Sequence, residues 1–146
     1  MPYDIIIGRD KEDRERYGDK GRIYLGKGYV KMGNYTSLSN ILWLDVIKSH
    51  VILIAGKRGS GKSYSIGVLA EGLSKLPPEV RDNIAPLIFD TMGIFWTMKY
   101  RNDQDIELLE DWDLKAEELP VNVWVPAGHY DEYAKRKIPV DRKFAL

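Results

Sequence analysis

Residues 51–63 are VILIAGKRGSGKS, in which an apolar run is followed at once by a glycine-rich loop. The run Val51–Ala55 is rich in β-branched residues, a pattern typical of a strand buried on both faces in a parallel sheet. The loop Gly56–Ser63 matches the P-loop pattern G-x-x-x-x-G-K-[S/T], which requires a strand before it and a helix after it. This stretch therefore predicts an α/β fold.

The segment after the loop predicts a helix over Lys62–Leu76. Its apolar residues recur on one face: Ile66, Leu69, Ala70, Leu73 and Leu76. Pro77 and Pro78 are expected to end the helix, since proline cannot continue it. Gly67 and Gly72 lie inside it at a cost of about 1 kcal/mol each relative to alanine. We expect them to allow close packing of the helix on the sheet.

Two further apolar segments predict core strands. Pro86–Asp90 is expected as a second buried strand that ends in an acid, and Val121–Val125 as a third. An aromatic connection, Thr91–Tyr100, and a short helix, Asp103–Trp112, are expected between them. Alternation of strands and helices predicts a core with a mostly parallel sheet.

The N-terminal part of the chain predicts short strands separated by turns. Ile5–Ile7 is one candidate, and three more are punctuated by glycine and asparagine: Arg22–Leu25, Tyr29–Met32 and Ile41–Leu44. We expect a small β-meander or partial barrel over residues 1–46. Residues 47–146 are then expected to form the N-terminal part of a P-loop ATPase domain.

Composition excludes several classes of protein. The 146 residues contain 22 Lys and Arg against 22 Asp and Glu, so no overall basic field draws in nucleic acid. The absence of cysteine excludes disulfides and thiolate chemistry. Apolar runs are far shorter than the roughly 18 residues of a membrane span, and the N-terminus does not resemble a signal peptide. We therefore expect a cytoplasmic protein without a membrane partner.

Two charge runs have a plain and a functional interpretation. Arg9–Lys20 holds ten charged residues, five of each sign. A solvated loop or frayed helix is favoured over a clamp onto a phosphate or another subunit. For Lys135–Lys137 a solvated face is likewise favoured over contact with DNA.

Four other side chains are weighed in the same way. His50, before the apolar run, is expected at the core or the edge of a strand rather than in catalysis, and His129 in solvent. Trp96 and Tyr100 could stack on a base, but aromatic residues after a strand belong more often to the core.

The loop carries the chemistry that the sequence predicts. Glycines let backbone amides approach phosphates closely, and the following helix adds positive charge at its N-terminus. Lys62 is expected at the β- and γ-phosphates as the catalytic lysine, and Ser63 as a ligand of Mg²⁺. At the loop tip, Lys57 and Arg58 either contact phosphates or face solvent. The candidate nucleotide-binding residues are Gly56, Lys57, Arg58, Gly59, Ser60, Gly61, Lys62, Ser63 and Tyr64.

Asp90 leaves three interpretations open. An acid at the end of an apolar strand resembles the Walker B aspartate, which holds Mg²⁺ through water. Asp90 lies only 28 residues after Lys62, with room for one helix and one connection. It could therefore line the edge of the nucleotide site, hold Mg²⁺ directly, or act as a structural cap.

The stretch Ser49–Ser63 resembles the HerA–FtsK group of P-loop ATPases, nearest to archaeal and bacterial HerA-like proteins. Ser49-His50 stands where that family commonly has Arg-His, and Asp90–Phe95 aligns with the family's Asp-Pro-His-Gly-Glu-Tyr-like stretch, with Ile94 in place of the glutamate. The resemblance covers about Ile41 to Phe95 well. It implies an ATP- and Mg²⁺-dependent DNA translocase or helicase, a hexameric ring of identical subunits, and often a nuclease partner.

Two features of a complete P-loop ATPase are not found in the sequence. After Lys62 we find neither a second apolar strand ending in Asp-Glu nor an obvious arginine finger. We therefore expect an N-terminal piece of a longer ATPase that binds nucleotide but does not hydrolyse it on its own. Two alternatives remain: a small P-loop kinase, and a regulatory or assembly module that binds nucleotide without turnover.

Overall fold

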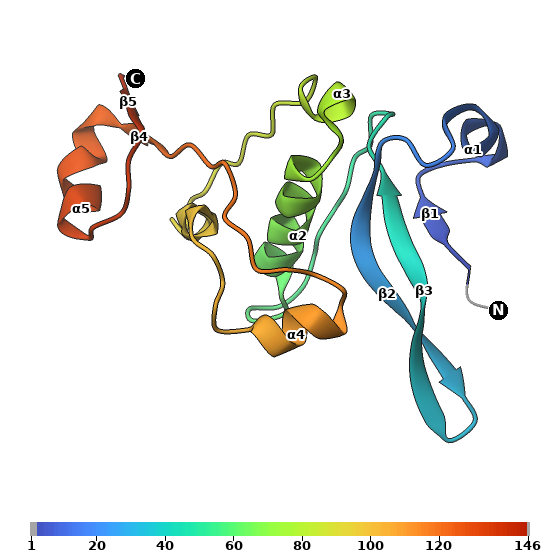
Figure 1. Ribbon diagram of the computed structural model, residues 1–146. Coiled ribbons are helices and arrows are strands. Elements are labelled where there is room, and N and C mark those ends of the chain that lie inside the picture. The colour runs from blue at the N-terminus through green and yellow to red at the C-terminus, as the bar shows by residue number, and fades with distance from the viewer. Residues whose placement is uncertain (1–2, 146) are drawn as a thin grey trace. The chain divides into compact units, whose positions relative to one another are not determined.

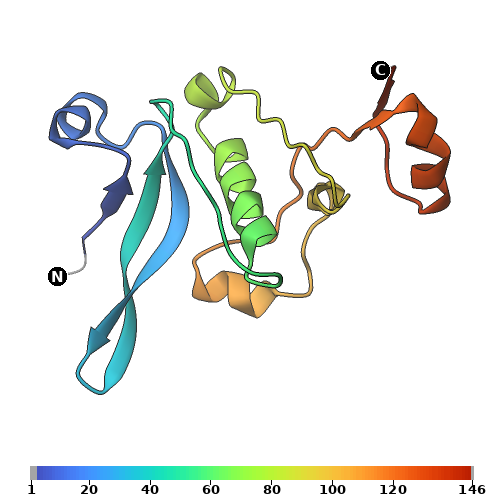
Figure 2. The ribbon, with the colours of Figure 1, turned by 180° about the vertical axis from the view of Figure 1, so that it is seen from behind.

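The computed structural model describes residues 3–145 of the chain. It is a mixed α/β protein in which contacts divide the chain into two compact units, Met1–Leu87 and Ile88–Leu146 (Figure 1; Figure 2 shows the opposite side). Each unit contains one small β-sheet. None of the described helices is both long and apolar enough to cross a membrane.

The first unit contains a three-stranded mixed sheet and three helices. Its elements are β1 (Ile5–Ile7), α1 (Lys11–Tyr17), β2 (Arg22–Met32), β3 (Tyr35–Asp45), α2 (Lys62–Ser74) and α3 (Pro78–Arg81). The strand order is β1-β3-β2, with β1 parallel and β2 antiparallel to β3. This sheet confirms the predicted strand at Ile5–Ile7.

A long hairpin, β2–β3, replaces the predicted meander of short strands. The expected break between Arg22–Leu25 and Tyr29–Met32 was wrong, because β2 runs through both segments with irregularities near Gly26 and Gly28. A glycine inside a strand marks a bulge as readily as a turn. The real turn is at Gly33, where φ is 60°, the left-handed region that a two-residue hairpin loop favours for glycine.

Helix α2 confirms the predicted helix and packs against β2. Buried Ile23, Leu44 and Leu76 form the core of this unit. A Cβ on Gly72 would lie 2.9 Å from Ile23 Cβ, so Gly72 allows the close approach that we predicted. Gly67 has nothing within 4 Å of a built Cβ, so the same prediction was wrong for Gly67. Helix α2 ends at Ser74, just before Pro77 and Pro78.

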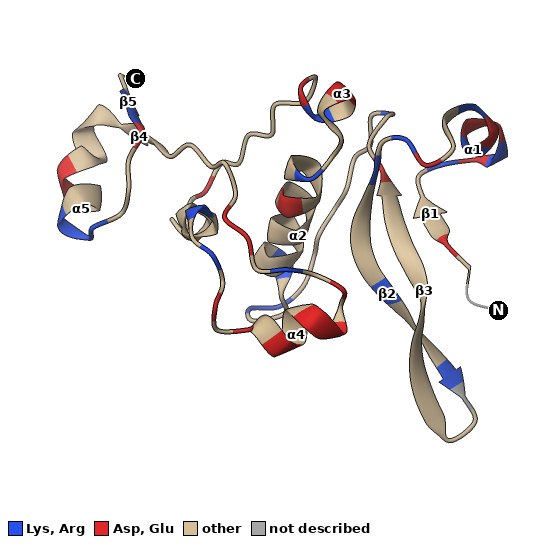
Figure 3. Ribbon diagram, in the orientation of Figure 1, with Lys and Arg blue, Asp and Glu red and all other residues tan. Residues whose placement is uncertain are grey.

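The charged segment before β2 confirms the solvated interpretation only in part. Figure 3 shows both signs of charge along α1, and Lys11 and Glu15 form an exposed i,i+4 pair. Arg9, however, is buried against Asp45. Its guanidinium also donates to the carbonyl oxygens of Gly18 and Lys20, at 2.5 and 2.7 Å.

The second unit is built from short elements. These are η1 (Phe95–Lys99), α4 (Ile106–Asp111), β4 (Trp124–Pro126), η2 (Ala127–His129), α5 (Tyr130–Lys135) and β5 (Arg142–Phe144). Strands β4 and β5 pair in parallel. Asp141 joins two segments here, accepting hydrogen bonds from Lys99 Nζ and from the Val123 backbone N–H. The Lys99 hydrogen bond is the main cause that lowers the pKa of Asp141.

Most of the predicted parallel sheet is not formed within residues 3–145. Val51–Ala55 and Pro86–Asp90 are not strands, and Val121–Val125 becomes a strand only from Trp124 onward. The side chains of Leu53, Leu87 and Phe89 are 89%, 77% and 87% exposed. These strand predictions were wrong for this structure because an apolar pattern does not supply the neighbouring strand that a ladder of hydrogen bonds needs.

Candidate functional site

The glycine-rich loop folds back on itself immediately before α2. The Ser60 backbone N–H donates to the Lys57 carbonyl at 3.2 Å, which closes a turn. Gly59 and Gly61 have φ values of 78° and 85°, in the left-handed region that only glycine adopts without strain. Such residues turn successive backbone N–H groups toward one side, as in an anion-binding nest.

Gly56 is required by the same fold of the loop. A Cβ at this position would lie 2.3 Å from Ser60 Oγ, closer than real contacts permit. Any other residue here would require the Ser60 side chain to move. The first glycine of the motif therefore has a steric reason that the structure shows directly.

Lys62 lies over the loop rather than extending into solvent. Its Nζ donates to the carbonyl oxygens of Gly56 and Lys57, both at 2.9 Å. Both partners are neutral, and no carboxylate among the described residues forms an ion pair with Lys62. The ammonium charge is thus fixed at the loop without a counterion, which favours an anion beside it.

The N-terminus of α2 adds to this positive potential. Its N-cap, Gly61, offers no side-chain hydrogen bond, and the first turn contains no acidic residue. The first N–H groups of the helix are therefore free for a ligand, and the helix dipole favours negative charge there.

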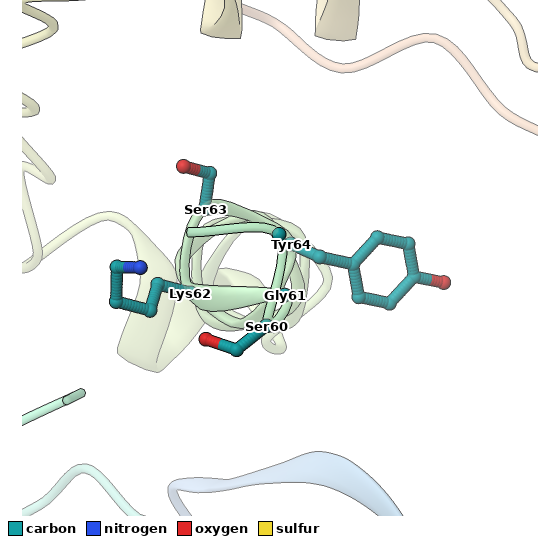
Figure 4. Close-up of a pocket in the computed structure, with 6 residues that line it drawn as sticks. Ser60, Gly61, Lys62, Ser63 and Tyr64 are labelled. Atoms are coloured by element: carbon teal, nitrogen blue, oxygen red, sulfur yellow. The ribbon is translucent and has the colours of Figure 1, made fainter. Parts of the chain in front are cut away.

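An open pocket of about 320 Å³ lies at this helix end, lined by residues 59–64. Figure 4 shows Lys62, Ser63 and Tyr64 leaving the helix end in different directions, with Lys62 and Tyr64 on opposite sides. The tip residues Lys57 and Arg58 are exposed. The structure thus places the predicted phosphate-binding residues of the loop, from Gly59 to Ser63, around one pocket.

Asp90, in the second unit, is fully engaged by its own chain. Its Oδ1 accepts from the backbone N–H groups of Met92 and Gly93, at 3.2 and 2.8 Å. Its Oδ2 accepts from those of Ile94 and Phe95, at 2.7 and 2.8 Å. A carboxylate offers about four lone-pair positions, and all are used. This geometry favours the structural cap over the other two interpretations of Asp90.

The residues present fit Mg²⁺ only with the help of phosphates. Among the described residues, no three acidic or histidine side chains come together in a way that could hold a metal. The Ser63 hydroxyl remains as a single candidate protein ligand. Mg²⁺ commonly keeps several waters and binds through one protein group plus substrate phosphates, so one serine is compatible with a nucleotide-borne ion.

His50, Trp96 and Tyr100 make contacts within the protein, whereas the basic run near the C-terminus faces solvent. His50 Nε2 lies 3.0 Å from Asp45 Oδ2, in agreement with a core-edge histidine. Trp96 Nε1 donates to the Gly93 carbonyl at 2.9 Å, and its ring packs edge-on against Tyr100. Lys135–Lys137 are exposed.

Sequence reasoning missed the cluster that the buried residues Arg9 and Asp45 form with His50. Burial acts to raise the pKa of Asp45, but hydrogen bonds from Arg9, His50 and the Lys48 backbone outweigh it and leave that pKa lowered. No local signal pairs Arg9 with Asp45, which lie 36 residues apart, although His50 lies only five residues after Asp45. Asp45 at the end of an apolar strand was the one available clue.

In comparisons with known proteins, no family model, curated sequence or solved structure matches this chain. The functional argument therefore depends on the loop itself.

Proposed function

We propose that this chain binds a nucleoside triphosphate, ATP together with Mg²⁺, at the loop Gly56–Ser63. One observation carries the proposal. The Lys62 ammonium is held by two carbonyl oxygens of a glycine-rich loop that opens directly into α2. A fixed cation, free helix N–H groups and left-handed glycines together form a site for a polyphosphate.

Each residue of the loop has a role in this proposal. The backbone N–H groups from Gly59 to Ser63 donate to the β-phosphate, and Lys62 neutralises the β- and γ-phosphates. Ser63 would hold Mg²⁺, which would neutralise part of the phosphate charge. Lys57 and Arg58, both exposed at the loop tip, add positive potential that attracts the ligand.

The contacts of Asp90 favour a chain that binds ATP without hydrolysing it. Phosphoryl transfer needs a positioned water and charge stabilisation beyond the loop. The Asp90 carboxylate is taken up by four backbone N–H groups and is not free to hold metal or water. No contact in the structure favours the alternative of a small P-loop kinase.

We further propose that the loop serves an ATP-driven DNA motor of the HerA–FtsK group, assembled as a hexameric ring. The support is the sequence of Ser49–Ser63 and of Asp90–Phe95. In such a motor, Val51–Ala55 and Pro86–Asp90 would be strands of a parallel sheet. Their exposed apolar side chains are consistent with strands that need neighbours.

Calorimetric titration tests the binding proposal. ATP and ADP in the presence of Mg²⁺ should bind, whereas AMP should bind far more weakly, because the loop holds the β-phosphate. Equal affinity for AMP and ATP would place the ligand somewhere other than the loop. Absence of heat with all three nucleotides would refute the proposal.

A further inference from the structure

Tyr64 is an exposed aromatic residue beside the candidate phosphate site. Its side chain is 75% exposed, yet it lines the same pocket as Gly59–Ser63. Its hydroxyl makes no hydrogen bond to the described residues. A large ring that neither packs nor bonds in the free protein is available to a ligand.

The direction of Tyr64 follows from helix geometry. Successive residues of an α-helix are about 100° apart, so Lys62 and Tyr64 leave nearly opposite sides of α2. Figure 4 shows this arrangement, with the tyrosine ring pointing away from the Lys62 side chain. Because Cα–Cβ bonds tilt toward the helix N-terminus, a first-turn tyrosine also leans toward the loop.

This direction determines which part of a nucleotide Tyr64 can meet. Lys62 Nζ is held by the carbonyl oxygens of Gly56 and Lys57. In the proposed function this ammonium neutralises the terminal phosphates, so they lie on the Lys62 side of the helix end. A polyphosphate that begins there and crosses the end of α2 brings its nucleoside to the opposite side, which is where Tyr64 lies.

We propose that Tyr64 forms the base subsite of this pocket and stacks on a purine ring. This inference rests on the proposed nucleotide binding at Gly56–Ser63. Stacking between a base and an aromatic side chain is tolerant of the identity of the base, and it is strongest for large π-surfaces. The subsite therefore accepts any base with a modest preference for purines, and it does not distinguish ATP from GTP by the ring alone.

Calorimetry with two probes separates base binding from phosphate binding. The probes are MgATP and magnesium tripolyphosphate, which lacks the nucleoside. Tyr64→Ala should weaken MgATP by about tenfold and leave tripolyphosphate unchanged, whereas Tyr64→Phe should bind both like the wild type. Tyr29→Ala is a matched control, because Tyr29 is also 75% exposed but lies on β2.

The outcomes distinguish this inference from the proposed function. MgATP affinity that is unchanged in Tyr64→Ala would overturn the base subsite while leaving the phosphate site intact. Equal weakening of both probes would also overturn it, since Tyr64 would then support the loop. A wild-type protein that binds neither probe would refute the proposed function and the subsite together.

Discussion

Arg9 donates two hydrogen bonds to Asp45 across 36 residues of sequence, from Nε at 3.0 Å and from Nη2 at 2.5 Å. Both side chains are at most 2% exposed. Both hydrogen bonds from Arg9 are to Asp45 Oδ1. Asp45 Oδ2 accepts hydrogen bonds from His50 Nε2 at 3.0 Å and from the Lys48 backbone N–H at 3.2 Å. His50, which directly precedes the apolar run Val51–Ala55, thus binds Asp45 at the end of β3.

Removing Asp45 should strongly destabilise the first unit. Asp45→Ala leaves the buried Arg9 guanidinium without its counterion, which typically costs about 3–5 kcal/mol. Urea unfolding followed by circular dichroism measures the loss. Glu15→Ala is the control, because the exposed Lys11–Glu15 pair is worth about 0.3–0.5 kcal/mol. Similar losses in the two variants would contradict the role given to Asp45.

Stability should fall in acid through the same carboxylate. The pKa of Asp45 is lowered from 3.8 in the folded protein, so its stabilising effect is fully present above about pH 4 and is lost as pH falls through the folded value. Unfolding free energies at a series of pH values, compared between wild type and Asp45→Asn, test this. The difference between the two should shrink below pH 4, and a difference independent of pH would disprove the assignment.

Asp90 should matter for local order rather than for nucleotide affinity. Asp90→Ala removes the acceptor of four backbone N–H groups, from Met92 to Phe95. Hydrogen exchange of these amides should become much faster, while MgATP affinity stays within about twofold. A large loss of Mg²⁺-dependent ATP affinity with little change in amide exchange would instead indicate that Asp90 holds Mg²⁺.

The exposed apolar segments should make the isolated chain associate. Leu53, Leu87 and Phe89 expose large apolar surfaces, and exposed strand-like segments of this kind favour association. Light scattering should show a mass that rises with protein concentration. Leu53→Lys together with Phe89→Lys should reduce that rise. A monodisperse, thermally robust monomer at all concentrations would show that these segments need no partner.

Turnover by the isolated chain should be negligible. The loop supplies binding groups, but the Asp90 carboxylate is not free to position water or metal. Phosphate release from MgATP should not exceed that of Lys62→Ala, with or without DNA. Multiple turnovers by the wild type alone would contradict binding without hydrolysis.

Local features of the fold could be predicted from the sequence. Helix α2 and its end before Pro77-Pro78 both follow from residues within one segment. Left-handed Gly59 and Gly61 were likewise implied by the motif. In each case the physical cause lies in a few neighbouring residues.

Non-local features could not be predicted. The apolar pattern of Val51–Ala55 indicates a strand but says nothing of its neighbours, and no strand within residues 3–145 pairs with it. The Arg9–Asp45 pair joins residues far apart in sequence, and charge runs alone do not reveal such partners. Asp90 was expected near the site because it ends an apolar segment and aligns with the acid of the HerA–FtsK group, whereas its four hydrogen bonds depend on the exact path of the following turn.

Calorimetric titration of MgATP into wild type and Lys62→Ala tests the central claim most directly. The lysine provides a charge-assisted contact to phosphate, worth about 1.5–3 kcal/mol, so the variant should bind at least tenfold more weakly. Lys31→Ala, an exposed lysine on β2, should bind like the wild type. Equal MgATP affinity in wild type and Lys62→Ala would contradict nucleotide binding at this loop.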